Sequence, residues 1–217
     1  MGEQLAPHFA RQVLRRDGPA QQRSTLDAGL QRVALQALRR QLAELQGRNV
    51  EDGAVVVLDN TSGEVLAWVG ANGESSAAAQ VDGVLARRQP GSTLKPFVYA
   101  LAFERRLITP ASLLDDSPAQ IPTGAGLYLP QNYDKSFKGY VSARASLGGS
   151  LNVPAVRVGA MLPPDALHAR LNALGLDLRE NAGWYGASLA LGSADVSLLA
   201  LSNAYRAMAN RGVFTPP

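Results

Sequence analysis

The chain has no cysteine and only two histidines, His8 and His168, among its 217 residues. The absence of cysteine excludes disulfides, thiolate metal ligands and cysteine nucleophiles. Two histidines that lie far apart in the sequence also argue against a histidine-rich metal centre and against a Ser-His-Asp triad. We therefore expect no metal and no cofactor, and acid–base chemistry would have to use other side chains.

A charge excess of one sign and long apolar runs are missing as well. The balance of 21 basic and 18 acidic residues leaves a net charge of +3, which does not indicate a nucleic-acid partner. No run approaches the roughly eighteen apolar residues of a membrane span, and the first residues lack the pattern of a signal sequence. With 46% hydrophobic residues, the composition predicts a soluble globular protein with an ample core.

The first half of the chain combines a long helix with a hairpin. Ser24 or Thr25 is expected to cap an amphipathic helix that ends at Gly47. Residues 53–58 and 64–69 are two apolar runs around a glycine-containing turn, which predicts an antiparallel hairpin. Because the first of these runs is almost entirely apolar, we expect both of its faces to be covered.

The second half is predicted to be mainly helical, so the whole chain reads as α+β. A helix is expected to begin near Ser92 and to run to about Arg106. Prolines and glycines between residues 110 and 130 indicate irregular loops of the kind that surround a site. Helical patterns then return at residues 141–148, 153–161, 164–174 and 196–210.

Ser92 and Lys95 lie three residues apart at the predicted start of a helix, directly after the break at Pro90 and Gly91. Residues i and i+3 share a helix face, and the free amide groups of a helix start favour negative charge on a nearby oxygen. A serine is a poor nucleophile until a base takes its proton. Lys95 is the candidate base in this segment, and it can act only if burial or a nearby cation lowers its pKa.

A second candidate pair is Ser150 and Asn152, which follow Gly148 and Gly149 and precede Pro154. Residues two apart do not share a helix face, so a loop or a strained helix boundary is needed to aim both side chains into one cleft. With fifteen serines, three lysines and nine asparagines in the chain, chance alone gives roughly 0.2 Ser-x-x-Lys and roughly 0.6 Ser-x-Asn patterns. Taken alone, Ser92 and Lys95 could therefore be a helix-capping serine and a solvated lysine. Ser150 and Asn152 could be a loop serine and an asparagine that starts a helix.

The sequence around both pairs resembles that of the class A penicillin-binding proteins, the serine D,D-transpeptidases that cross-link peptidoglycan. The resemblance rests on residues 88–97 and 146–156, and it extends to residues 25–27, 53–69, 131–133 and 190–205. It implies the α/β sandwich of the penicillin-recognising serine transferases, in an incomplete form. The N-terminal hairpin and the helical subdomain would be present, and the later strands of the sheet would be missing.

The resemblance also implies a role for each candidate residue. Ser92 would attack the D-Ala-D-Ala carbonyl of a peptidoglycan stem peptide or the ring of a β-lactam, with Lys95 as its base and its own amide as half of an oxyanion hole. Ser150 would relay a proton toward the leaving amine. Asn152 would bind the substrate amide and help to orient Lys95. An amine of a neighbouring stem peptide would then open the acyl-enzyme.

The third motif of that family, Lys-Thr/Ser-Gly on a later strand, does not occur in the sequence. We therefore interpret residues 24–217 as the N-terminal part of a transpeptidase domain and residues 1–23 as a linker remnant. A glycosyltransferase domain and a membrane anchor are expected in the full-length protein, on the periplasmic side of the bacterial inner membrane. Without the third motif, the 217-residue chain alone is expected to have little or no transpeptidase or penicillin-acylation activity, unless another chain supplies the missing strand.

Two other functions remain open at this point. A serine β-lactamase would share the nucleophile and base, but nothing after Ser150 resembles the glutamate segment that activates the deacylating water in class A β-lactamases. A non-catalytic peptidoglycan-binding or scaffold module would explain the absent third motif. It would leave unexplained why Ser92, Lys95, Ser150 and Asn152 are all present.

Overall fold

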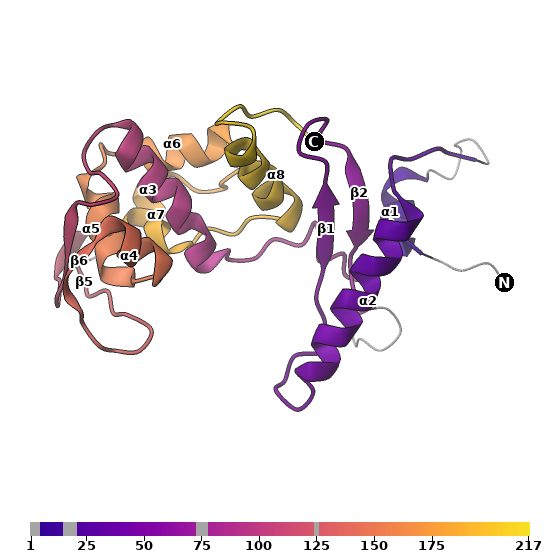
Figure 1. Ribbon diagram of the computed structural model, residues 1–217, viewed down its shortest axis with the longest axis horizontal. Helices are drawn as coiled ribbons and strands as arrows, with labels where there is room; N and C mark the ends of the chain where they lie inside the picture. The colour runs from indigo at the N-terminus through magenta and orange to yellow at the C-terminus, as the bar shows by residue number, and fades with distance from the viewer. Residues whose placement is uncertain (1–4, 15–20, 73–77, 124–125) are drawn as a thin grey trace. The chain divides into compact units, whose positions relative to one another are not determined.

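The structure is a computed structural model that describes residues 5–14, 21–72, 78–123 and 126–217. The chain divides into two compact units (Figure 1). Unit 1 comprises residues 1–87 and 197–217, and unit 2 comprises residues 88–196. Within the described ranges, no helix is both long enough and apolar enough to cross a bilayer.

Unit 1 is built on the predicted hairpin. Strands β1 and β2 pair antiparallel, with Val55 opposite Val69, and the register shifts between Val57 and Leu58. The helix before the hairpin starts later than predicted. Asp27 is its N-cap, because its Oδ1 accepts the Leu30 amide at 2.7 Å, so the assignment of the cap to Ser24 or Thr25 is wrong. The elements of unit 1 are α1 (Pro7–Val13), α2 (Ala28–Glu44), β1 (Val55–Leu58), β2 (Val65–Val69) and α8 (Leu198–Ala209).

The core of unit 1 lies between α2 and the hairpin, which lie side by side in Figure 1. Ala34 and Leu38 of α2 pack with Ala67 and Val69 of β2, and alternate residues of β1 join them. Strand β1 also contacts α8. All four β1 residues are nevertheless only half-buried, so the expected cover on both faces is partial in the described chain.

Unit 2 is largely helical, as predicted, but it contains short strands that were not. Strands β3, β4 and β5 lie in the segment expected to be irregular, and β6 extends into the start of the helix expected at residues 141–148. β3 pairs with β6 and β4 pairs with β5, both antiparallel. A short helix and a 3₁₀ turn after residue 181 were also missed. The elements of unit 2 are η1 (Gly91–Leu94), α3 (Lys95–Glu104), β3 (Leu113–Asp116), β4 (Ile121–Thr123), β5 (Gly126–Tyr128), β6 (Gly139–Ser142), α4 (Ala143–Gly148), α5 (Asn152–Met161), α6 (Ala166–Ala173), α7 (Ala182–Tyr185) and η2 (Gly186–Leu191).

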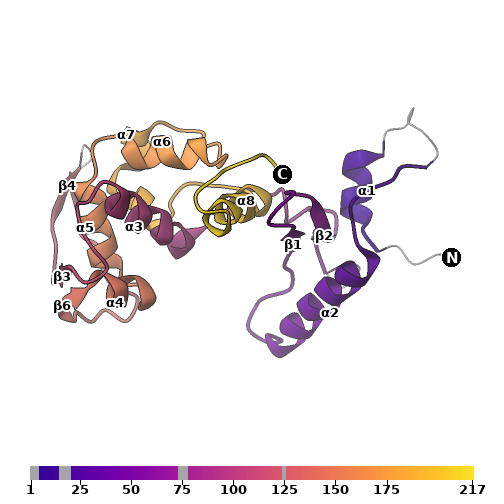
Figure 2. The ribbon, with the colours of Figure 1, turned by 45° about the horizontal axis from the view of Figure 1, so that its top comes forward.

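Helix α3 is the centre of unit 2. It contacts α4, α5, α6 and η2, and its grouping with α4 and α5 can be followed in Figure 2. Its predicted apolar series is buried, including Phe97, Val98 and Leu101. The Tyr99 hydroxyl lies 2.8 Å from Ser146 Oγ and joins α3 to α4 through a fully buried pair. Helix α3 therefore begins from a rigid base, and its first residue is Lys95.

Candidate active site

Ser92 lies in the 3₁₀ turn η1 directly before α3, at the predicted helix start. The turn is held from behind by Gly192, whose carbonyl accepts the Gly91 amide at 3.3 Å. A Cβ on Gly192 would lie 2.1 Å from the Gly91 carbonyl oxygen, and Gly192 itself has φ of +80°. Only glycine fits both conditions, so this residue fixes the backbone before Ser92.

The Lys95 amine is buried at the start of α3, with 1% of the residue exposed. Its Nζ donates to the Ser150 carbonyl oxygen at 2.5 Å, to Asn152 Oδ1 at 2.6 Å and to Ser150 Oγ at 3.1 Å. Burial lowers the pKa of Lys95 to about 8, because removal from water penalises the charged amine. The structure therefore brings three of the four predicted site residues together.

This arrangement accommodates the amine in both protonation states. An ammonium has three N–H groups, and three acceptors surround Nζ. A neutral amine has two N–H groups and a lone pair, which can accept a proton from the Ser150 hydroxyl while the two remaining oxygens still accept from Nζ. The oxygens around Nζ therefore fit the hydrogen-bonding pattern of the charged amine and that of the neutral amine.

Ser150 and Asn152 converge on Lys95 because the chain breaks between α4 and α5. Helix α4 ends at Gly148, and Ser150 adopts a left-handed conformation with φ of 53°. Helix α5 then starts at Asn152. A continuous helix would point residues two apart to different faces, so the strained boundary confirms the geometric expectation drawn from the flanking glycines. The Asn152 Nδ2 donates to the Gln131 carbonyl, which turns its Oδ1 toward Lys95.

Ser92 is exposed, and in the described part of the chain its hydroxyl makes no hydrogen bond. It lies three residues before Lys95 in a 3₁₀ turn, where residues i and i+3 eclipse, so both side chains start from the same face. Among the described residues, its amide is likewise not engaged by a carbonyl. The direct contact between Ser92 and Lys95 therefore stays a prediction. The Ser92 amide is available to donate a hydrogen bond to an oxyanion.

Two buried residues beside this site, Asn132 and Asp116, have no predicted role from the sequence. Asn132 Oδ1 accepts the Asn152 amide at 2.8 Å. Its only sequence signal was that residues 131–133 fitted the family resemblance. An asparagine in a loop twenty residues earlier carries no periodicity that would connect it with α5.

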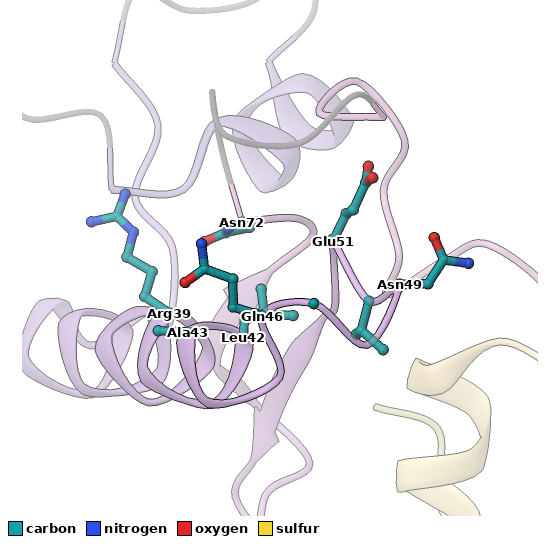
Figure 3. Close-up of a pocket in the computed structure, with 9 residues that line it drawn as sticks. Arg39, Leu42, Ala43, Gln46, Asn49, Glu51 and Asn72 are labelled. Carbon is teal, nitrogen blue, oxygen red and sulfur yellow. The ribbon is translucent and has the colours of Figure 1, made fainter.

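A hollow of about 1020 Å³ lies in unit 1, at the end of α2 (Figure 3). In the close-up, Arg39 projects from α2, Gln46, Asn49 and Glu51 come from the segment after the helix, and Asn72 lies near Gln46. The side chains that surround Lys95 all belong to unit 2. Volume alone does not indicate chemistry here, because this hollow holds none of the predicted site residues.

Comparison with known proteins identifies the family. The profile of the penicillin-binding protein transpeptidase domain matches residues 53–217. The chain therefore belongs to the transpeptidase-domain family of the class A penicillin-binding proteins. Among its members, the chain is 40% identical to penicillin-binding protein 1C of Escherichia coli (strain K12) over 212 residues, 96% of this chain and 27% of that protein. Residues 91–96 and 111–116 of this chain also resemble the corresponding segments of that protein.

Other relatives extend the match. Penicillin-binding protein 1B of Vibrio cholerae (serotype O1, El Tor Inaba N16961) is 34% identical over 81% of this chain and 22% of its own length. The structure of penicillin-binding protein 1A from Haemophilus influenzae aligns with a TM-score of 0.65 at 29% identity, over 73% of this chain and 23% of that one. PonA1 from Mycobacterium tuberculosis aligns with a TM-score of 0.74 at 24% identity, over 90% and 51%, which supports the fold alone. The chain spans about a quarter of the curated relatives it matches.

Proposed function

We propose that this chain carries the nucleophile half of a D,D-transpeptidase site. The Ser92 Oγ attacks the carbonyl between the two D-alanines of a stem peptide and forms an ester, while its proton passes to the neutral Lys95 amine. The terminal D-alanine leaves, and the proton reaches its amine through Ser150. An amine of a second stem peptide then attacks the ester, releases Ser92 and completes the cross-link. A β-lactam would acylate Ser92 by the same attack, with its ring amide as the leaving group.

The observation that carries the proposal is the buried Lys95 amine, held by Ser150 and Asn152, three residues after an exposed serine with a free amide. Burial of a charged lysine costs stability, so a buried lysine beside a serine supports a functional role for its amine as the base. The free Ser92 amide supports the role of an oxyanion donor, since one such donor elsewhere contributes about 3 to 4 kcal/mol to transition-state stabilisation.

The Lys-Thr/Ser-Gly motif is absent from the 217 residues. We propose that this motif supplies the second oxyanion donor and the site for the substrate carboxylate, and that the 217-residue chain alone has little transpeptidase or acylation activity. In the full-length protein, residues 24–217 would belong to the transpeptidase domain, behind a linker that ends near residue 23. A glycosyltransferase domain and a membrane anchor would place it in the periplasm, where stem peptides and β-lactams reach it.

The alternative is a non-catalytic peptidoglycan-binding module, and the observation that favours it is the missing hydrogen bond between Ser92 and Lys95. Hydrogen bonds of catalytic groups are often long before substrate binds, so transpeptidation is the better-supported function. A serine β-lactamase would form the same adduct and differ only in releasing it rapidly.

The test is the intact mass of the chain after incubation with benzylpenicillin, beside a longer form that continues past Pro217 to a Lys-Thr/Ser-Gly segment. We expect a persistent adduct on Ser92 in the longer form and none in the Ser92→Ala variant, while the exposed Ser24→Ala control keeps it. Labelling of the 217-residue chain would contradict the role given to the third motif. Rapid loss of the adduct would indicate a β-lactamase, and labelling of neither form would favour the binding module.

A further inference from the structure

Asn132 is a buried amide, 4% exposed, and its partners use every hydrogen-bonding position it has. Its Nδ2 donates to both carboxylate oxygens of Asp116, at 2.8 and 2.9 Å, and to the Ser136 carbonyl at 2.8 Å. Its Oδ1 accepts the amides of Asn152 at 2.8 Å and Val153 at 3.3 Å. A reversed amide would set its NH₂ group against two backbone donors, so these partners fix its orientation.

The start of α5 depends on this side chain. The first amides of a helix have no partner within the helix, and here the N-cap is Leu151, whose side chain has no oxygen. Asn132 supplies the missing acceptor from a distant loop, while the neighbouring Gln131 carbonyl accepts the Asn152 Nδ2 at 2.8 Å. Residues 131 and 132 thus hold Asn152 by its backbone and by its side chain. Its Oδ1 is left for Lys95.

Asp116 anchors Asn132 from the other side. It lies on β3, it is fully buried, and it accepts the Lys138 amide at 2.9 Å in addition to the two bonds from Asn132. A buried carboxylate is costly unless such donors surround it. The chain of contacts therefore runs from Asp116 through Asn132 and the start of α5 to Asn152 and Lys95.

We propose that Asn132 is a positioning residue for this site: anchored on Asp116, it fixes the start of α5 so that Ser150 and Asn152 present their oxygens to the Lys95 amine. The geometric consequence can be tested without any activity. The catalytic consequence rests on the proposed function, and a separate measurement reads it.

The geometric test uses the titration of Lys95 in the 217-residue chain labelled with ¹³C-lysine. The chain has three lysines, and the exposed Lys135 serves as an internal reference. In Asn132→Ala we expect the Lys95 midpoint to move by at least about 0.5 pH unit, upward where water replaces the displaced acceptors and downward where none does, with faster hydrogen exchange at the Asn152 amide. The matched control is Asn172→Ala, because Asn172 Oδ1 also accepts a backbone amide in unit 2, that of Leu178 at 2.7 Å. It should leave Lys95 unchanged.

A swap of the two anchor residues provides the rescue. Asn132→Asp alone buries two carboxylates face to face. It should lower the melting temperature and change the titration midpoint of Lys95. In the double variant Asp116→Asn with Asn132→Asp, the new amide donates to the new carboxylate, whose other oxygen still accepts from α5. The carboxylate at position 132 also faces the Ser136 carbonyl, as it does in Asn132→Asp alone, so the recovery is partial. We expect the double variant to be more stable than Asn132→Asp and to recover part of its change in the Lys95 midpoint, which a merely additive effect would not give.

The catalytic consequence is read as the rate of penicillin acylation in the longer form. We expect Asn132→Ala to slow acylation about tenfold or more and Asn172→Ala to change it less than about twofold, at a temperature where both are folded. An unlabelled wild type would refute the proposed function and leave the titration result standing. An unchanged Lys95 midpoint in Asn132→Ala, equal effects of the two alanine variants, or no rescue in the swap would overturn the positioning role.

Discussion

Lys95 should lose its proton near pH 8 in the folded chain, because burial penalises the charged amine and lowers its pKa from 10.5 to about 8. At pH 7.5, a pKa of about 8 leaves roughly a quarter of the amine neutral, whereas a pKa of 10.5 would leave roughly one part in a thousand. The buried site thus increases the fraction of competent base by about two hundredfold at that pH. That gain is large enough to decide whether Lys95 can accept the proton of Ser92.

The same pKa makes the stability of the fold depend on pH. Below pH 8 the folded and unfolded chains both carry the proton, and between about 8 and 10.5 only the unfolded chain binds it. The free energy of unfolding must therefore rise with pH across that window. The difference between 10.5 and 8 is 2.5, which corresponds to about 3 kcal/mol in total. Burial of Lys95 thus costs stability at neutral pH, and the cost disappears at high pH.

The assay is urea unfolding of the wild type and of Lys95→Met at several pH values from 6.5 to 9.5, together with the ¹³C-lysine titration. The difference between the two chains removes contributions from tyrosines, which begin to ionise at the upper end of the range. We expect the wild type to gain stability relative to Lys95→Met as the pH rises through 8. A Lys95 midpoint above about 10, or a stability difference that does not change with pH, would refute the argument.

Three further predictions concern the elements that hold the site and its neighbours. Asp27→Ala should lower the free energy of unfolding by about 1 kcal/mol through loss of the α2 cap, and Ser24→Ala by less than about 0.5, in urea titrations; equal losses would contradict the cap. Tyr99→Phe should cost about 1 to 2 kcal/mol, because it leaves a buried hydroxyl on α4 without its partner. Gly192→Ala should cost about 2 kcal/mol more than Gly47→Ala. Both glycines have φ of +80°, but only the first would push its Cβ against backbone, at the start of η1.

Much of the fold could be predicted because its signals are local. The α3 start needed only a proline–glycine break and an apolar series, and the hairpin needed two apolar runs with a turn between them. The α2 cap was misplaced by two or three residues, since Ser24, Thr25 and Asp27 are all good capping residues and only the tertiary position of β2 selects among them. The Asp27 amide donates to the Leu66 carbonyl of β2 at 2.9 Å. No local sequence pattern predicts this contact.

The strands of unit 2 were missed for a different reason. Strands β3 to β6 are three or four residues long and contain glycine, proline or paired aspartates, so they carry neither alternation nor β-branched runs. Their pairing is tertiary: β3 meets β6 across more than twenty intervening residues. The role of Asn132 could not be predicted for the same reason, because it lies twenty residues before Asn152 in the sequence. The candidate catalytic residues belong to short local motifs and could be named from the sequence, whereas Asn132 and Asp116 lie outside those motifs and could not.

The burial of Lys95 explains why the site needs residues that hold the candidate catalytic groups in place as well as those groups themselves. At neutral pH the buried Lys95 amine lowers the stability of the fold by about 3 kcal/mol. Other contacts must therefore hold the surrounding oxygens in place. Three satisfied contacts in unit 2 provide this rigidity: the Gly91–Gly192 approach behind η1, the Tyr99–Ser146 pair between α3 and α4, and the Asp116–Asn132 anchor at α5. These contacts hold η1 directly before Lys95, the pairing of α3 with α4, and the start of α5, where Asn152 Oδ1 accepts from Nζ. A buried amine with a pKa near neutrality therefore requires neighbours that are fully hydrogen-bonded, because any loose acceptor would admit water and return its pKa toward the usual value.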